Sequence, residues 1–420
     1  MSIDKICLLA YLSQHPTQAL GPSCGGHSLP HSPQTTHWLS ALKHEELAPF
    51  NPNPTKYKVY RNVRDYGAKG DGVTDDSAAI NLAISEGDRC GKGCGSATIS
   101  PAIVYFPPGK YLIAHSLLQY YYTQFIGDPI NLPELIMAPN FDGDNVHALI
   151  ASDNYYEGGD TPYWPQTNNF YREIRNFVID LTKGPLNKEA TAIHWQVAQA
   201  TSITNVHVKM STQPGNNQQG LWMENGSGGY MSDLTFHGGK FGMWIGNQQF
   251  TTRNVVITEA DTAVFMKWVW AWTFKGLTVE NCKTAIDITS LTDKTKQQQI
   301  GSMLLMDSKI VNTSIGVLTV NTAASQPASA GTLILDNVEL FNCPKAVARP
   351  DGTTVLDGGK VTIKSWGQGR FYDAQGHGEY REATLPAPAK PSVLLGPDGR
   401  FFERPKPQYT DVAVGDFEPI

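Results

Sequence analysis

The chain has 420 residues and a formal net charge of −6, which argues against nucleic acid or an anionic membrane as its main partner. Hydrophobic residues make up 40% and charged residues 17%, so we expect a folded chain with a weakly charged surface. The 39 glycines and 27 prolines favour short strands and many turns over long helices. No segment approaches the roughly 18 apolar residues of a membrane span, so no membrane partner is expected.

The N-terminus has a short apolar run at residues 6–12 behind a single lysine. We expect residues 1–36 to be either a degenerate secretory signal or a disordered tail. None of the six cysteines has the CxxC spacing of a zinc site, and we expect no metal. Cys90 and Cys94 could close a small loop if the protein is secreted. Cys282 and Cys343 each follow a strand pattern and could instead be buried thiols.

Residues 60–84, YRNVRDYGAKGDGVTDDSAAINLAI, place glycines and aspartates directly before a helical pattern. A phosphate-binding loop is excluded because the Walker spacing GxxxxGK(S/T) is missing. A calcium loop is excluded because Asp71, Asp75 and Asp76 do not follow the EF-hand pattern. Either of the last two can be the N-cap of a short helix. We therefore predict a helix that caps the first coil of the fold and is entered through a tight glycine turn.

From about residue 170 the chain repeats one step, a polar residue or glycine followed by an apolar-any-apolar triplet. The step begins at Asn176, Asn205, Asp233, Asn254, Gly276 and Asn337. Successive starts lie 29, 28, 21, 22 and 61 residues apart, and the last interval fits two repeats if the weaker match DSKIVN at 307–312 is counted. Because no amphipathic helix lies between these short strand patterns, a βαβ fold is excluded.

A second short step alternates with these triplets. It reads TAIHWQ, QGLWME, FGMWIG, TAVFMK, TAIDIT, IGVLTV and KAVARP. Short strands repeated at this interval are typical of a parallel β-helix, in which each coil buries its apolar face on its neighbours. We predict an all-β, single-stranded right-handed parallel β-helix over residues 37–380, with about seven coils between 170 and 360. A proline-rich strap is expected over 381–420.

A set of ordered segments resembles the N-terminal half of fungal exo-β-1,3-glucanases of glycoside hydrolase family 55. The segments span residues 37 to 410 and include GAKGDGVTDD, VYFPPGKYLI, AIHWQVAQATSI, ENGSGGYMSDLTFHGG, GNQQFTTRNV, WVWAWTFKGL and FFERPKPQY. The first segment alone is only moderately specific, because many pectate-lyase-like β-helices and phage tailspikes carry it. The ordered set is specific.

The resemblance implies a secreted glucan 1,3-β-glucosidase that hydrolyses β-1,3-glucan with inversion and without a cofactor. Members of that family hold the substrate between two tandem β-helices, and the general acid lies on the second. This chain stops at DVAVGDFEPI, about where the second helix would begin. We therefore expect the acid to come from a second β-helix domain or a separate chain. The alternatives are a non-catalytic β-glucan-binding module and an inactive remnant.

Gln199 and Ser227 match the family positions that hold the attacking water, a role that a neutral amide and a hydroxyl can fill. They lie 28 residues apart, as do neighbouring strand repeats, so we expect them on adjacent coils facing one side. Glu224 is the best carboxylate candidate, either as a sugar ligand or as a solvated surface residue. Of Gln248 and Gln249, at most one can face a groove from a strand.

Trp268, Trp270 and Trp272 alternate along an extended pattern, so all three indoles are expected on one face. Such a row can stack on glucose rings, pack as a core ladder or contact a second domain. His194 is expected to be a core histidine rather than a catalyst. The polygalacturonase alternative lacks paired aspartates although FHGGK occurs at 236–240, and a pectate lyase would need an acidic cluster that the sequence does not provide.

Overall fold

The structure is a computed structural model that describes residues 37–403 except 144, 160, 187 and 189. The predicted tail over 1–36 therefore lies outside the described residues. Contacts divide the chain into two units, one formed by Lys43–Ala389 and a smaller one to which residues 37–42 and 390–403 belong. The smaller unit contains α2 (Trp38–Ala41) and the short helix η2 (Ser392–Leu394). In it the ammonium of Lys390 lies 4.9 Å from the ring centroid of Phe401.

The larger unit is built almost entirely of strands, as predicted. The helices in it are η1 (Val63–Tyr66) and α3 (Ser77–Ser85). The strands before the central coils are β1 (Tyr60–Asn62), β2 (Asp71–Asp75), β3 (Ala102–Phe106), β4 (Lys110–His115), β5 (Leu117–Leu118), β6 (Thr123–Gly127), β7 (Glu134–Asp142) and β8 (Ala148–Ala151). The later strands are β9 (Glu173–Asp180), β10 (Thr191–His194), β11 (Ser202–Lys209), β12 (Gln219–Met223), β13 (Tyr230–His237), β14 (Phe241–Thr258), β15 (Thr262–Glu280), β16 (Thr284–Ile288), β17 (Ile300–Met306), β18 (Lys309–Val311), β19 (Ile315–Thr319), β20 (Thr332–Ala348), β21 (Thr354–Tyr372) and β22 (Gly378–Thr384). Among the described residues, no helix is long and apolar enough to cross a membrane.

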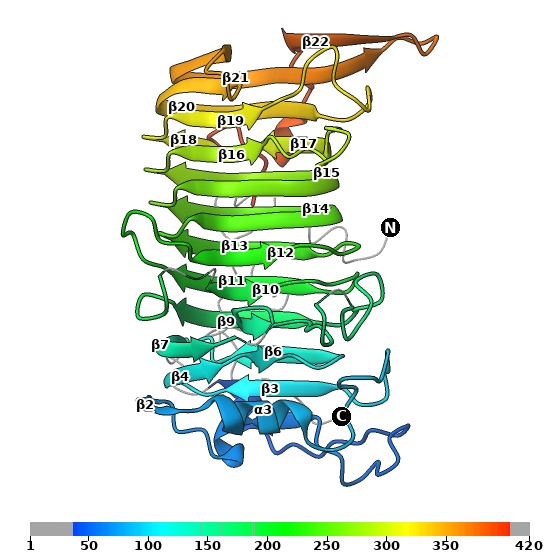
Figure 1. The fold of residues 1–420 in the computed structure, drawn as a ribbon, viewed down its shortest axis with the longest axis vertical. Coiled ribbons are helices and arrows are strands. Elements are labelled where there is room, and N and C mark those ends of the chain that lie inside the picture. Colours follow the sequence, from blue (N-terminus) through cyan, green and yellow to red (C-terminus); the bar gives the residue numbers. More distant parts are fainter. Residues whose placement is uncertain (1–36, 144, 160, 187, 189, 404–420) are drawn as a thin grey trace, which may run out of the picture. The chain divides into compact units, whose positions relative to one another are not determined.

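Strands of successive coils pair in parallel, one coil above the next (Figure 1). One sheet runs β9, β11, β13, β14 and β15, and a second runs β8, β10, β12, β14, β15, β16 and β19. The long strands β14 and β15 belong to both sheets because each continues around a corner of its coil. This arrangement confirms the predicted parallel β-helix.

The repeated polar-or-glycine step forms one corner of each coil. Its members have positive φ angles, which are 67° at Asn176, 54° at Asn205, 57° at Asp233, 51° at Asn254, 71° at Gly276, 49° at Asp307 and 55° at Asn337. Asp307 belongs to the weak match DSKIVN, so that segment is a coil of its own, as predicted. Among residues with a side chain, asparagine and aspartate enter this left-handed conformation at the lowest cost. The polar residue or glycine of the repeated step therefore marks the position where the chain turns.

Side-chain amides link these corners from one coil to the next. Asn205 Nδ2 donates to Asn176 Oδ1 over 2.8 Å, and Asn176 Nδ2 donates to the Gly127 carbonyl over 3.1 Å. Farther along, Asn337 Nδ2 donates to Asp307 Oδ1 over 2.8 Å. The bonds run parallel to the coil axis, so they fix the register between coils in the same way as the backbone bonds of the sheets.

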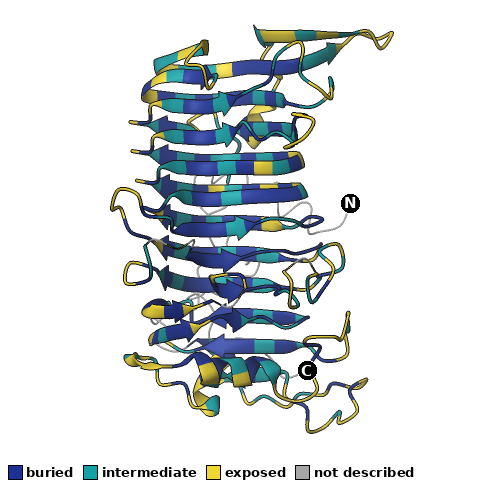
Figure 2. Cartoon of the chain, viewed as in Figure 1, coloured by how far each residue is buried: buried dark blue, intermediate teal, exposed yellow. Residues whose placement is uncertain are grey.

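The second repeated step supplies a buried column inside the helix. Its middle residues pair in register from coil to coil and lie in the core, namely Ile193, Leu221, Met243, Val264, Ile286, Val317 and Val347. Burial of each aliphatic side chain contributes roughly 1.5–3 kcal/mol relative to exposure. Figure 2 shows the consequence, with buried segments along the strands and exposed residues in the connecting loops.

The opening element caps the first coil. Residues of α3 join the same core through Ile80, Ala83 and Ile84. Asp76 occupies the N-cap position, but its carboxylate bonds the glycine loop instead, accepting from the amides of Lys69 (2.6 Å) and Gly70 (2.9 Å). Asp75 Oδ1 accepts a hydrogen bond from the amide of Ser77 over 3.0 Å. Asp75 and Asp76 therefore each close one part of the turn.

The other end of the helix is closed by a change of strand direction. β21 pairs antiparallel along nearly the whole of β20, and β22 pairs antiparallel with the end of β21. β22 continues across the predicted boundary at residue 380. The parallel stack therefore ends at β20 within the described chain.

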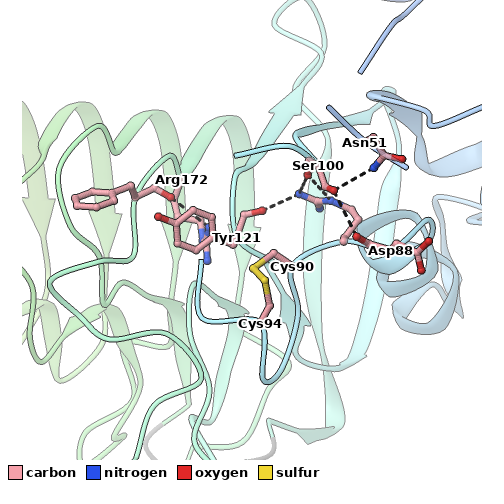
Figure 3. The surroundings of a disulfide bond; sticks show 9 residues. Asn51, Asp88, Cys90, Cys94, Ser100, Tyr121 and Arg172 are labelled. Carbon is pink, nitrogen blue, oxygen red and sulfur yellow. Dashed lines mark hydrogen bonds between the residues drawn. A yellow bond between two sulfur atoms is a disulfide. The ribbon is translucent and has the colours of Figure 1, made fainter. Parts of the chain in front are cut away.

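A disulfide joins Cys90 to Cys94 in the loop beside the first coils (Figure 3). In the same region the guanidinium of Arg172 lies 4.9 Å from the ring centroid of Tyr121. Cys282 and Cys343 are free and buried, in agreement with the prediction of core thiols.

Replacing Asn176 tests the corner. Asn176→Ala removes two hydrogen bonds of about 1 kcal/mol each and places alanine in a left-handed conformation at about 1 kcal/mol more, so we expect the free energy of unfolding to fall by about 3 kcal/mol. Asn176→Gly loses the same bonds without the backbone strain and should be less destabilising. Urea unfolding of the two variants measures the difference, and equal losses would contradict the role of the positive φ angle.

Candidate functional site

The structure brings Gln199 and Ser227 together on adjacent coils, as predicted. Gln199 Nε2 donates to the Ser227 carbonyl over 2.8 Å, and Ser227 Oγ donates to Gln199 Oε1 over 3.2 Å. The serine is buried and the glutamine is exposed. These two bonds hold the amide in one orientation while part of it faces solvent.

Close contact between coils makes this pairing possible. Gly226 has a φ of 152°, and a Cβ atom there would lie 2.4 Å from the Val197 carbonyl and 2.2 Å from Asn247 Nδ2. Ser227 N also donates to the Val197 carbonyl over 3.1 Å. Only glycine allows the chain to approach its neighbour so closely, so the motif ENGSGG places Ser227 directly beside the coil that carries Gln199.

A shallow hollow of about 300 Å³ opens beside this pair, and we call it the Gln199 groove. It is lined by Gln199, Gly228, Gly229, Gln249, Phe250, Thr251, Ala271 and Thr273. Gln249 lines it and Gln248 does not, which agrees with the expectation that at most one of the two faces a groove. Within the described part of the chain, the lining contains amides, hydroxyls and one aromatic ring, but no carboxylate.

The prediction that three indoles share one face is wrong. Trp270 is 63% exposed, whereas Trp272 is 2% exposed and stacks on Phe250 with ring centroids 4.8 Å apart. Trp270 and Ala271 are both exposed between buried neighbours, so alternation breaks there because β15 turns a corner of the coil. Trp268 is half-buried and donates through Nε1 to the Glu224 carbonyl over 2.8 Å.

Glu224 lies in a different hollow from Gln199, of about 380 Å³, which we call the Glu224 pocket. It is lined by Asn145, Tyr155, Gly159, Pro162, Gln166, Gln196, Trp222, Glu224 and Asn225. The structure thus places Gln199 and Gln249 in the lining of the groove, with Ser227 bonded to Gln199, and separates Glu224 from them.

The carboxylate of Glu224 is held by two donors at one oxygen. Tyr155 Oη donates to Oε1 over 2.5 Å, and His194 Nε2 lies 2.8 Å from the same atom. Burial raises the pKa of Glu224, but the hydrogen bond and charge of His194 and the hydrogen bond from Tyr155 outweigh it, so the pKa lies below its ordinary value. His194 is fully buried, as expected, yet it also orients this carboxylate.

A second carboxylate supports the pocket from behind. Asp153 is fully buried, and its Oδ2 accepts from Gln196 Nε2 over 3.2 Å. Gln196 Oε1 lies 3.1 Å from Tyr155 Oη and shares its single proton with Glu224 Oε1. Burial raises the pKa of Asp153 to about 6, although the bond from Gln196, the charge of His194 and two backbone amides act in the opposite direction.

Sequence reasoning missed Asp153, Tyr155, Gln196 and Trp222. Aligning the second repeated step would have found the last, because His194, Trp222, Trp244 and Phe265 occupy the same place in successive repeats and pair in register. Asp153, Gln196 and Glu224 each follow that column by two residues. Tyr155 lies in an irregular segment that carries no periodic signal.

No group of three or more histidine, cysteine, aspartate or glutamate side chains within the described part of the chain is arranged to hold a metal ion.

The raised pKa of Asp153 predicts a pH-dependent stability. The folded state binds this proton more tightly than the unfolded chain, so the contribution of Asp153 to stability is greatest below about pH 4 and is lost as the pH rises to about 6. Asp153→Asn removes this titration. The free energy of unfolding of the variant, relative to the native chain, should therefore rise by roughly 2 kcal/mol between pH 4 and pH 7.

Asp71→Asn is the matched control. Hydrogen bonds from the backbone amides of Thr74 and Val73 and from the Thr74 hydroxyl lower the pKa of Asp71 to about 2. The contribution of Asp71 to the free energy of unfolding is therefore fully present above about pH 4. The difference between this variant and the native chain should stay constant from pH 4 to pH 7. Urea unfolding across this range measures both, and a flat profile for Asp153→Asn would refute the raised pKa.

Comparison with known proteins agrees with this fold. The profile of the family described as rhamnogalacturonase A/epimerase, pectate lyase-like, matches residues 60–287. A probable glucan endo-1,3-beta-glucosidase of Arthroderma benhamiae is 48% identical over 374 residues, which cover 89% of this chain and 42% of that protein. A glucan 1,3-beta-glucosidase of Cochliobolus carbonum is 44% identical over 384 residues, covering 91% and 48%.

A third relative, the non-secreted LysM effector LysM19 of Penicillium expansum, is 43% identical over 395 residues, which cover 92% of this chain and 31% of that protein. The chain therefore spans less than half the length of each of these three relatives. Because the matched profile covers more than half of a chain that folds as a parallel β-helix, this protein belongs to the rhamnogalacturonase A/epimerase, pectate lyase-like family.

Proposed function

We propose that the chain supplies the water-positioning side of a glucan 1,3-β-glucosidase site that hydrolyses β-1,3-glucan with inversion. The observation that carries the proposal is the hydrogen-bonded pair Gln199 and Ser227 beside the groove, in a chain 44% identical to a protein named glucan 1,3-beta-glucosidase. The organisms of the three relatives described above are fungi, and we propose a fungal source for this chain as well.

Inverting hydrolysis needs an acid for the leaving oxygen and an oriented water on the opposite face of the sugar, with the two catalytic groups roughly 6.5–9.5 Å apart. A water beside Ser227 Oγ and Gln199 Nε2 would accept a bond from the amide and donate one to the hydroxyl. Neither group carries a charge, so this pair orients the water without acting as a strong base. The two bonds between the pair fix its geometry before the substrate binds.

The general acid is the missing part of this site. None of the described residues that line the Gln199 groove is a carboxylate, and Glu224 lies in the other pocket. An acid delivered from a second β-helix domain or a separate chain would complete the reaction. This partner is part of the proposal, together with β-1,3-glucan as the substrate.

The absence of a carboxylate from the lining of the groove also favours a second candidate, a module that binds β-glucan without cleaving it.

Hydrolysis of laminarin tests the first candidate, with the purified 420-residue chain mixed with the part of the Cochliobolus carbonum relative that it does not match, because a partner must supply the acid. Gln199→Ala and Ser227→Ala should each lower the rate of glucose release roughly 10²-fold, because the attacking water loses an orienting partner. Gln213→Ala removes an exposed glutamine outside the two hollows and serves as the control.

Glucose release that is unchanged in both variants would reject the proposed roles of Gln199 and Ser227. Binding of laminarin by this mixture without release of glucose would reject the first candidate and select the binding module instead.

We also propose that the protein is secreted. The Cys90–Cys94 disulfide supports this location, because disulfides persist in oxidising compartments. One relative is named a non-secreted effector, so the location needs a direct test. Expression of the full chain in a filamentous fungus should place it in the medium with both of these thiols blocked to labelling, and retention in the cell with free thiols at 90 and 94 would contradict secretion.

A further inference from the structure

The Glu224 pocket and the Gln199 groove have no lining residue in common. The pocket lies beside the column formed by β8, β10 and β12, and Tyr155, Gly159, Pro162 and Gln166 line it from the segment that follows β8. Among the described residues, its lining combines one carboxylate, four side-chain amides, one phenol and one indole, with no lysine or arginine. A gap between loops that was lined only by apolar side chains would not present these polar groups to a ligand.

Glu224 presents a fixed hydrogen-bond acceptor to this pocket. Both of its protein partners, Tyr155 and His194, bind Oε1, and within the described residues Oε2 makes no hydrogen bond. The side chain is 27% exposed. An ionised carboxylate held in one orientation accepts strong hydrogen bonds from hydroxyl groups.

Other lining residues supply two further features of a sugar-binding site, namely side-chain amides and an exposed aromatic surface. Gln166 and Asn225 each offer an amide that can both donate and accept. Trp222 is half-buried, so part of its indole is exposed as a flat apolar surface. The C–H face of a pyranose ring packs on such a surface while its hydroxyls reach polar neighbours.

The same lining excludes other ligand classes. An anionic ligand would meet the Glu224 carboxylate, and none of the described lining residues is a cation that could offset the repulsion. A lipid or aromatic ligand would leave the carboxylate and amides without partners. A neutral, hydroxyl-rich ligand satisfies every group.

We propose that the Glu224 pocket binds one residue of a neutral glucan chain, at a site separate from the Gln199 groove. The choice of glucan as the sugar rests on the proposed function, whereas the site itself rests on the geometry of the pocket.

The sheet outside the pocket indicates the course of the rest of the glucan chain. Trp244 and Phe265 continue the column of Trp222 on the next two coils, with ring centroids 6.4 and 5.9 Å apart in succession. Both rings are half-buried on the outer face of the sheet. A chain that starts in the pocket therefore passes over these two rings.

Titration of β-1,3-linked glucotriose and glucohexaose into the full-length Gln199→Ala variant, followed by calorimetry, tests the proposal without turnover. In this background Glu224→Gln and Trp222→Ala should each weaken binding of the triose roughly tenfold. Trp244→Ala should remove the gain in affinity from triose to hexaose.

Two controls protect the interpretation. Phe341→Ala removes an exposed ring in a hollow of about 430 Å³ elsewhere on the chain and should leave binding unchanged. Gln166→Ala changes only a surface loop of the pocket and should also weaken binding. It replaces Trp222→Ala in the test if thermal melting by circular dichroism shows that the tryptophan variant does not fold.

Sugar binding that is unchanged in the Glu224, Trp222 and Gln166 variants, or no binding to the Gln199→Ala parent, would overturn the proposal. If the native chain mixed with the acid-carrying partner does not hydrolyse laminarin but these variants weaken binding, the proposed function fails and the pocket proposal stands. If hydrolysis depends on Gln199 and the pocket variants bind normally, the reverse holds.

Discussion

The structure depends on a left-handed turn that recurs once in each of its central coils and that, at several of them, is joined to the next coil by a side-chain amide. At Asn176 and Asn205 the backbone adopts a conformation that most side chains resist, and the two amides are joined over 2.8 Å. Each coil is thereby locked in register with its neighbour, and the apolar residues on either side of the turn fall on buried columns. Nearest-neighbour contacts of this kind make the stability of a solenoid nearly a sum over coils.

Fixed register explains how distant residues meet at the candidate site. A displacement of one residue between coils would move every side chain to the opposite face of its sheet. Because that is prevented, Gln199 and Ser227 bond each other across 28 residues of sequence, and Gly226 allows the two segments to approach. The same register aligns Asp153, Gln196 and Glu224, whose different environments move the two carboxyl pKa values in opposite directions.

The fold could be predicted from the sequence because an asparagine, aspartate or glycine occupies the left-handed turn that recurs from coil to coil. The Gln199–Ser227 contact followed from that repeat together with the family resemblance. The indoles of residues 268–272 were misplaced because strict alternation holds only along a straight strand, and β15 bends at Trp270 and Ala271. Tyr155 could not be predicted at all, since it reaches Glu224 from a loop whose path is set by tertiary packing.

The stacking of corners also bears on how such a chain can change during evolution. Duplication or loss of one whole coil preserves every buried column, so length is expected to vary among descendants without loss of folding. The segment between Gln199 and Ser227 is the exception, because one additional coil there would move the amide and the hydroxyl apart by about 5 Å, the spacing of neighbouring strands. Gene-level variation in length should therefore avoid this segment wherever the chemistry is retained.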